Sequence, residues 1–226
     1  MNVGLKLPAL RIVLASNNAR KLAELSAMMS GVGNGNDMGI ELVAQGALGI
    51  TEAEEPHLTF IENALAKARH AAAAAQGPAI ADDSGLCVDV LGGAPGVISA
   101  HYAGEVPAHG DREARRRQQD AANNALLLQH LAGKTDRRAH FISTLVAVRH
   151  AEDPQPLVAV GRWPGEILTA PRGDQGFGYD PLMFIPELHC TVAQMDATLK
   201  NTHSHRARAM LQLRALLREV WGLGSG

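Results

Sequence analysis

The pattern with the most chemical content is a short apolar run that ends in two adjacent carboxylates. Residues 79–81 are Ala, Ile and Ala, and they are followed by Asp82, Asp83, Ser84 and Gly85. A short apolar run is typical of a buried strand, and carboxylates at its end need a neutralising partner. Because Mg²⁺ prefers carboxylate oxygen, one interpretation is a metal site at the strand's end. The other is a solvated acidic turn, since Asp, Ser and Gly are common turn residues.

A second candidate site is the Ser-Asn-Asn-Ala-Arg-Lys segment at residues 16–21, which follows an apolar run. Backbone N–H groups at a helix start attract phosphate, and Lys21 adds a full positive charge. The glycine spacing of a P-loop is absent. The other interpretation is a plain helix cap with a solvated lysine, because Asn17 or Asn18 is a good N-cap.

An acid pair and a lysine surround the start of the next predicted helix. Glu54 and Glu55 precede that helix and could complete a metal site with Asp83. Alternatively, they favour the positive end of the helix electrostatically. On a 3.6-residue period Lys67 falls away from the apolar face that contains Phe60. It therefore points either into solvent or into a cleft.

Residues 176–181, Gly-Phe-Gly-Tyr-Asp-Pro, combine glycines, an aromatic ring and an acid. Glycine permits close backbone approach to a ligand, Phe177 can stack on a planar ring, and Asp180 can accept hydrogen bonds. The other interpretation is a tight turn with a core phenylalanine.

The last candidate site combines Lys200 with Ser204, His205 and Arg206 at a predicted helix start. Paired donors there suit an oxo group or a phosphate, whereas the common alternative is a set of surface cap residues. A metal pair from His203 and His205 is disfavoured, because no Cys or carboxylate accompanies them at ligand spacing. GxSxG, HExxH and Cys-His signatures are absent from the sequence, so the chemistry indicated is that of carboxylates and a metal.

The elements that must position these residues alternate between apolar strands and capped helices. Together they predict an α/β fold, in which a long twisted mixed sheet is flanked by helices and two lobes enclose a central nucleotide cleft. No linker is evident, so residues 1–226 are predicted to form a single domain. The predicted strands are 11–15, 40–44, 79–81, 139–149 and 157–169. The predicted helices begin after Asn18, at Thr59, at Asp111 and at Ser204, and a flexible loop is predicted at 31–39. The predicted buried stripes are Phe60, Ile61, Ala64, Leu65 and Ala68 on the second helix and Leu213, Leu216, Leu217 and Val220 on the last.

Composition excludes several function classes. The 226 residues carry a formal net charge of −2, and aromatics make up 4%, so neither a polyanion-binding surface nor a nucleic-acid stacking platform is indicated. The basic run at 112–117 is interpreted as a solvated helix face. Cys87 and Cys190 lack CxxC partners, which disfavours disulfides and zinc. Without a signal peptide or an apolar membrane span, we expect a cytoplasmic protein without nucleic-acid or membrane partners.

Taken in order, the motifs resemble those of the Ham1/RdgB-type inosine triphosphate pyrophosphatases, which remove non-canonical purine nucleotides. The resemblance covers nearly the whole chain, from Ile12 to the last helix. The motifs are Ser-Asn-Asn-Ala-Arg-Lys at 16–21, Thr-Phe-Ile-Glu-Asn-Ala at 59–64, Ala-Asp-Asp-Ser-Gly-Leu at 81–86, Gly-Gly-Ala-Pro-Gly at 92–96, Gly-Phe-Gly-Tyr-Asp-Pro at 176–181 and Ser-His-Arg at 204–206.

The resemblance implies a Mg²⁺-dependent homodimer that hydrolyses ITP, dITP and XTP to the monophosphate and pyrophosphate, which keeps them out of DNA and RNA. It implies that Asp83 is the general base and a metal ligand, and that Glu54, with Glu55 as the second choice, shares the metal. The substrate-binding residues that it implies are Ser16, Asn17, Asn18, Ala19, Arg20, Lys21, Lys67, Ser84, Phe177, Gly178, Tyr179, Asp180, Lys200, His205 and Arg206. The chain departs from the family pattern at Asn17, where Gly is common, and in a longer loop at 33–39.

Two other functions are compatible with the motifs. One is a pyrophosphatase for modified pyrimidine nucleotides. The other is a nucleotide sensor without catalysis, against which the intact acid set of Glu54, Asp82 and Asp83 argues, because a pure binder needs no hydrolytic base.

Overall fold

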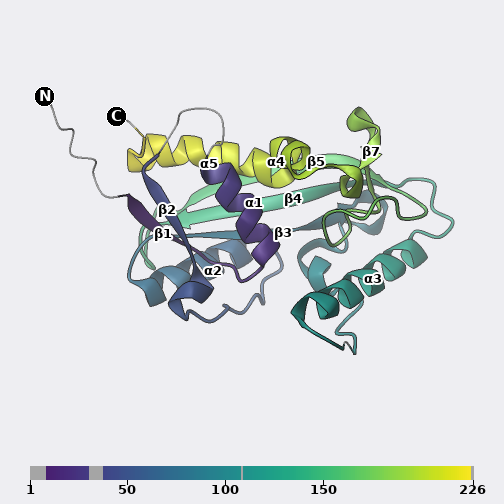
Figure 1. The fold of residues 1–226 in the computed structure, drawn as a ribbon, viewed down its shortest axis with the longest axis horizontal. Coiled ribbons are helices and arrows are strands. Elements are labelled where there is room, and N and C mark those ends of the chain that lie inside the picture. The colour runs from purple at the N-terminus through teal and green to yellow at the C-terminus, as the bar shows by residue number, and fades with distance from the viewer. Residues whose placement is uncertain (1–8, 31–37, 108, 225–226) are drawn as a thin grey trace, which may run out of the picture. The chain divides into compact units, whose positions relative to one another are not determined.

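The computed structural model describes residues 9–30, 38–107 and 109–224 (Figure 1). The predicted loop at 31–39 therefore lies largely outside the described residues. The strands are β1 (Leu10–Leu14), β2 (Ile40–Ala44), β3 (Ala79–Val88), β4 (Arg138–Val148), β5 (Leu157–Ile167), β6 (Met183–Ile185) and β7 (Cys190–Thr191). The α-helices are α1 (Ala19–Ser30), α2 (Phe60–Ala75), α3 (Arg112–His130), α4 (Ala197–His203) and α5 (His205–Trp221).

Within the described ranges, seven strands form one sheet in the order β2-β1-β3-β4-β5-β6-β7. β1 pairs in parallel with β2 and with β3, whereas β6 pairs antiparallel with β5 and β7. The predicted mixed sheet flanked by helices is thus confirmed. The register matches Leu14 with Ile80, and the N–H of Ala15 donates to the carbonyl of Ile80 at 2.8 Å. This register brings the segment that follows β1 beside Asp82.

The sequence predicted the acid pair at the end of a strand at 79–81. The structure instead places both acids inside β3. β3 continues through Asp82 and Asp83 to Val88, and both side chains are buried, with exposed fractions of 2% and 5% for the residues. The interpretation as a solvated acidic turn is wrong. Turn propensity is a local preference, and pairing with neighbouring strands overrides it when buried carboxylates find cationic partners.

The described residues group into two compact units. The first comprises those of Met1–Asp83, Thr144–Gly161 and Arg206–Gly226, and the second comprises those of Ser84–Ser143 and Arg162–His205. The boundaries fall inside β3, β4, β5 and α5. The predicted single domain without a linker stays a prediction.

In the first unit, β1 is buried on both faces. Ile12 and Leu14 pack in one apolar cluster with residues of α1 and α5, including Leu25 and Leu213. The alternate residues Val13 and Ala15 pack in another cluster with the alanines of α2. Because successive strand side chains point to opposite faces, α1 and α5 cover one face of the strand and α2 covers the other. A strand covered on both faces explains the unbroken apolar run that the sequence shows.

In the second unit, the core lies between α3 and the sheet. Leu127 and Leu131, in and just after α3, cluster with Phe141, Trp163 and Ile167 of β4 and β5. The predicted helix start at Asp111 is confirmed, since its carboxylate accepts from the N–H of Ala114 at 2.8 Å.

Two details of the predicted helices are wrong. Ile61 is 48% exposed and Val220 is 41% exposed, so neither belongs to its predicted buried stripe. The buried face of α2 consists of small residues, Asn63, Ala64, Ala68, Ala71 and Ala72. Small residues permit close packing on the sheet, which a periodicity read from large apolar side chains alone does not detect. Within the described residues, no helix is both long and apolar enough to cross a membrane.

Candidate active site

The turn before α1 is organised by Asn18. Its side-chain oxygen accepts from the N–H of Arg20 at 3.2 Å and from that of Lys21 at 3.3 Å, while the N–H of Asn18 donates to Ser16 Oγ at 3.2 Å. The predicted N-cap is confirmed and assigned to Asn18. Asn17 lies against Gly46, where a Cβ would stand 2.8 Å from its side-chain oxygen. The absence of a side chain at Gly46 therefore leaves room for Asn17, which stands where the family commonly has glycine. In the same turn, Ala19 is exposed.

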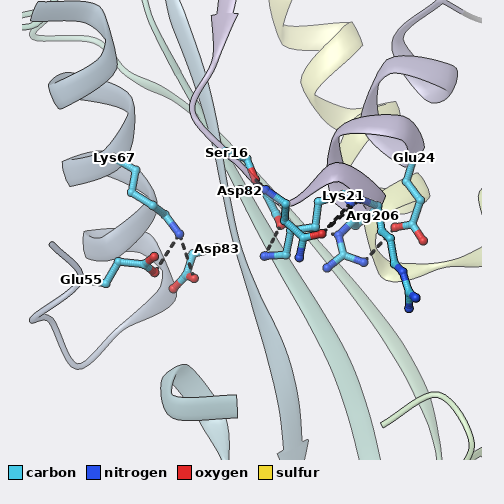
Figure 2. A network of polar contacts seen from close by, with 10 residues as sticks. Ser16, Lys21, Glu24, Glu55, Lys67, Asp82, Asp83 and Arg206 are labelled. Atoms are coloured by element: carbon cyan, nitrogen blue, oxygen red, sulfur yellow. Dashed lines mark hydrogen bonds and ion pairs between the residues drawn. The ribbon is translucent and has the colours of Figure 1, made fainter. Parts of the chain in front are cut away.

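Asp82 lies at the centre of a charged network in the first unit (Figure 2). Its Oδ2 is 2.9 Å from Lys21 Nζ and 3.5 Å from Arg206 Nε, and its side chain has no exposed surface. Arg206 Nη1 also contacts Glu24 Oε2 at 3.0 Å. The network therefore joins two cations of the predicted substrate site, one from α1 and one from α5, through a single carboxylate.

Asp83 lies in a different network, which Figure 2 shows around Lys67 of α2. Lys67 Nζ is 2.8 Å from Glu55 Oε2 and 3.2 Å from Asp83 Oδ1, and its side chain is 12% exposed. The interpretation of Lys67 as a solvated lysine is thus wrong. Burial lowers the pKa of Lys67, but attraction by Asp83 and Glu55 outweighs it, so that this pKa lies above its ordinary value.

The carboxyl of Asp83 has the properties of a proton acceptor. Burial raises the pKa of Asp83 to about 6, although Lys67 and Lys21 act in the opposite direction. Its Oδ2 is buried and makes no hydrogen bond within the described part of the chain. A carboxylate of this pKa, with one oxygen available, can take a proton from water near neutral pH.

The carboxyl of Asp83 is also suited to a hard cation. Asp83 and Glu55 both direct carboxylate oxygens at one positive atom, Lys67 Nζ, and carboxylate oxygen is the donor that Mg²⁺ prefers. Glu54 is exposed. Among the described residues, no group of three or more His, Cys, Asp or Glu side chains is gathered in a ready metal site. The donors that the structure brings together are therefore Asp83 and Glu55.

In the second unit, Asp180 organises the loop at 176–180. Its carboxylate lies 2.8 Å from Lys200 Nζ and accepts from the N–H of Phe177 at 3.0 Å. Lys200 Nζ also lies 4.7 Å from the centre of the Phe177 ring. Asp180 and Lys200 are buried. Gly176 has a φ of +76°, and its missing side chain leaves the space that the Asp180 carboxylate fills.

Two side chains of α3 hold the same loop from another direction. The N–H of Gly178 donates to Asp120 Oδ2 at 2.9 Å, and its carbonyl accepts from Asn124 Nδ2 at 3.0 Å. The Tyr179 side chain is buried, and its hydroxyl donates to the carbonyl of Ser99 at 2.9 Å. The loop is therefore fixed through its backbone, which leaves the Phe177 ring half-buried.

The remaining predicted residues of the second unit lie near strands β3 and β4. Ser84 is half-buried within β3. His205 is buried, and its ring stacks on Phe141 of β4 with 5.0 Å between the ring centres and 29° between the planes. His203 Nδ1 lies 3.2 Å from the carbonyl of Leu199. The imidazole of His205 is thus held in one plane by an aromatic neighbour.

Residues 12–216 match the model of the Ham1 family. The chain belongs to the Ham1 family. It is 66% identical over 212 residues to a dITP/XTP pyrophosphatase of Methylibium petroleiphilum, a match that covers 94% of this chain and 99% of that protein. It is 64% identical over 217 residues to a dITP/XTP pyrophosphatase of Leptothrix cholodnii, covering 95% of this chain and all of the relative.

Solved structures agree with this membership. A HAM1 protein from Coxiella burnetii matches with a TM-score of 0.80 and 39% identity, covering 93% of this chain and 100% of that one. The Ham1 protein of Staphylococcus aureus matches with a TM-score of 0.76 and 35% identity, covering 92% and 98%. The fold of this chain is therefore that of the Ham1 proteins.

Three polar contacts of this Ham1 chain were missed by the sequence reasoning: those of Glu24, Asp120 and Asn124. Asp120 and Asn124 are spaced i, i+4 on α3, which places them on one face of the helix. Glu24 is spaced i, i+3 from Lys21 on α1. The helical spacing was thus visible in the sequence. The contacted partners, Gly178 for α3 and Arg206 for Glu24, are distant in the chain, so the contacts themselves were not.

Proposed function

We propose that this chain is a nucleoside triphosphate pyrophosphatase that hydrolyses ITP, dITP and XTP to the monophosphate and pyrophosphate. The proposal is supported by the dITP/XTP pyrophosphatases that share 66% and 64% identity with nearly the whole chain. The observation that carries the chemistry is Asp83, a buried carboxylate with one oxygen in contact with Lys67 and the other without a hydrogen bond in the described residues.

In the proposed reaction, Asp83 orients water and accepts its proton. The water oxygen forms a bond to phosphorus while the bond between the α-phosphate and the β-phosphate breaks, and pyrophosphate leaves. A base whose pKa is raised to about 6 is largely ionised at neutral pH, yet is more basic than an ordinary aspartate. The neighbouring lysines offset the negative charge that collects on the phosphate oxygens.

Mg²⁺ would be held by Asp83 and Glu55, with Glu54 as a further donor. When bound, it would offset the charge of the triphosphate and polarise the reacting phosphate. The carboxylate character of these donors and the buried free oxygen of Asp83 support this assignment.

We assign the phosphate chain to the first unit. The N-terminal end of α1 carries the positive end of the helix dipole, which favours an anion beside residues 16–21, and Lys21 and Lys67 add positive charge. Both lysines are largely buried, which strengthens their attraction for phosphate by reducing screening from solvent. Each is held by a carboxylate, so its position is defined before substrate arrives.

We assign the nucleoside to the Phe177–Asp180 segment, Ser84, Lys200 and His205, and the 6-oxo group of the base to Arg206 and His205. A donor aimed at the 6-position bonds an oxo group but leaves a 6-amino group unmatched. A buried donor left unmatched costs about 1–3 kcal/mol, which is enough to disfavour adenine. Stacking of the base on the ring of Phe177 would supply the apolar contact that a purine needs.

The proposal also includes a homodimer, as the family resemblance implies. The cytoplasmic location and the absence of nucleic-acid and membrane partners stay predictions from the sequence.

The deciding experiment is pyrophosphate release from a panel of nucleoside triphosphates, measured with Mg²⁺ and with EDTA. We expect release from ITP, dITP and XTP with Mg²⁺, and far slower release from ATP. Faster cleavage of dUTP or a methylated pyrimidine triphosphate would indicate the pyrimidine pyrophosphatase. Tight binding of ITP without release of pyrophosphate would indicate the sensor.

A further inference from the structure

Asp82 is a buried carboxylate that the proposed reaction does not use. Its side chain has no exposed surface, and it lies one residue before the proposed base. Successive residues of a strand point to opposite faces, so Asp82 shares the face of Ile80, which packs in the cluster of α1 and α5. It therefore points to the face opposite that of α2, to which Lys67 belongs, and it influences Lys67 and Asp83 through space by its charge.

What Asp82 contacts is a pair of cations from two helices. Lys21 Nζ lies 2.9 Å from its Oδ2, and Arg206 Nε lies 3.5 Å from the same oxygen. Side-chain exposure is 18% for Lys21 and 5% for Arg206. Two cations held at one oxygen in a poorly solvated place would repel each other without the carboxylate.

We propose that Asp82 is a positioning residue that fixes Lys21 and Arg206 together, so that phosphate binding and base selection depend on one buried carboxylate. This inference rests on the proposed function, in which Lys21 binds phosphate and Arg206 reads the base. Without Asp82 the ammonium of Lys21 is free to turn toward solvent, and the guanidinium of Arg206 loses one of its ionic contacts.

The two cations depend on Asp82 to different degrees. Arg206 keeps its contact with Glu24 at 3.0 Å, which holds the guanidinium from the α1 side. For Lys21, Asp82 is the one ion-pair partner among the described residues. Loss of Asp82 should therefore weaken phosphate binding strongly and base selection more moderately.

The test is Asp82→Asn in the full-length chain, which keeps the side-chain volume and removes the charge. We expect KM for ITP to rise about tenfold and the ratio of kcat/KM for ITP to that for ATP to fall about threefold, the sizes expected for losing one charge-assisted contact and part of another. The dissociation constant of inorganic pyrophosphate, measured by calorimetry, should also rise about tenfold.

Asp153→Asn is the matched control. Asp153 is likewise fully buried in the first unit and ion-paired to an arginine, with 3.0 Å between Arg149 Nε and its Oδ2. It tests the general effect of neutralising a buried, paired carboxylate. We expect this variant to lose stability while KM, the dissociation constant of pyrophosphate and the ITP-to-ATP ratio stay at the wild-type values. If Asp82→Asn behaves in the same way, Asp82 is only structural and the inference is overturned.

Two further measurements keep the test decisive. If Asp82→Asn does not fold, Lys21→Met is compared with the Lys21→Met/Asp82→Asn double variant, in which one cation leaves with the acid. The inference requires the ratio of kcat/KM for ITP to that for ATP to be lower in the double variant than in Lys21→Met. An equal ratio in the two variants refutes it. If the wild type binds ITP but does not hydrolyse it, the proposed function fails, and the dissociation constants of ITP and pyrophosphate still decide the role of Asp82. A wild type that binds neither ligand overturns both.

Discussion

Replacing Asp83 by Asn should change activity and stability in opposite directions. The substitution keeps the volume of the side chain and leaves Lys67 its contact with Glu55 at 2.8 Å. It removes the proton acceptor, so we expect kcat to fall by about 10²–10⁴-fold, the usual contribution of a general base. Binding of ITP should persist, because Lys21, to which phosphate binding is assigned, is held in place by Asp82 and not by Asp83.

The stability change follows from the direction of the pKa shift. Burial raises the pKa of Asp83 from 3.8 to about 6, so its ionised form is disfavoured in the folded chain. A rise of this size corresponds to at most about 3 kcal/mol of lost stability. The loss is absent below pH 4, where the carboxyl is protonated in both states. It develops between pH 4 and pH 6 and is complete at pH 7.

The neutral amide of Asn avoids this loss. In EDTA at pH 7 the variant should therefore be more stable than the wild type by about 1–3 kcal/mol, and the difference should vanish near pH 4. Urea unfolding at both pH values measures the change, and pyrophosphate release from ITP with Mg²⁺ measures the activity. Asp153→Asn is the control of opposite sign, because contact with Arg149 lowers the pKa of Asp153, and that variant should be less stable at pH 7.

If the Asn variant retains kcat within threefold of the wild type, Asp83 is not the base, and the base lies elsewhere. The stability prediction is refuted if the variant, relative to the wild type, is less stable at pH 7 than at pH 4. That outcome would mean that the ion pair with Lys67 outweighs the burial of the carboxylate.

Three other predictions follow from the contacts. Asn124→Ala removes a hydrogen bond to the carbonyl of Gly178, and we expect KM for ITP to rise about fivefold with kcat unchanged in steady-state assays; an unchanged KM would separate α3 from substrate binding. Arg206→Ala should lower the ITP-to-ATP ratio of kcat/KM by about tenfold or more, and an unchanged ratio would place base recognition elsewhere. Removal of Mg²⁺ with EDTA should abolish turnover, with recovery on adding Mg²⁺ back; turnover that persists in EDTA would contradict the metal assignment.

The first part of the site could be predicted because its signals are local. The apolar run of β1, the asparagine cap and the helical spacing after it lie within twenty residues, and the structure confirms the cap at Asn18. The same holds for Thr59, whose side chain accepts from the N–H of Glu62 at 3.2 Å. Capping depends on neighbouring residues, so a sequence reveals it without tertiary information.

Contacts between distant segments could not be predicted in this way. The pairing of Asp120 and Asn124 with Gly178 joins residues more than fifty positions apart. The placement of Lys67 away from the apolar face of its helix was wrong, because seven positions after Phe60 amount to nearly two whole turns and so return to that face. The carboxylates that Lys67 meets there depended on the path of β3. Propensity also ended β3 too early, because the turn preference of Asp, Ser and Gly is weaker than the pairing of the strand.

The different roles of Asp82 and Asp83 follow from the continuation of β3 through both residues. In a turn, adjacent acids can share one ligand, and from the sequence only the family resemblance divided them, with Asp83 as the base and Asp82 as a supporting or structural partner. In a strand they must point to opposite faces. The clusters identify those faces, since Ile80 packs with α1 and α5 whereas Ala79 and Ala81 pack with α2. Asp82 therefore meets Lys21 and Arg206, and Asp83 meets Lys67. The two carboxylates consequently hold different cations and are not interchangeable.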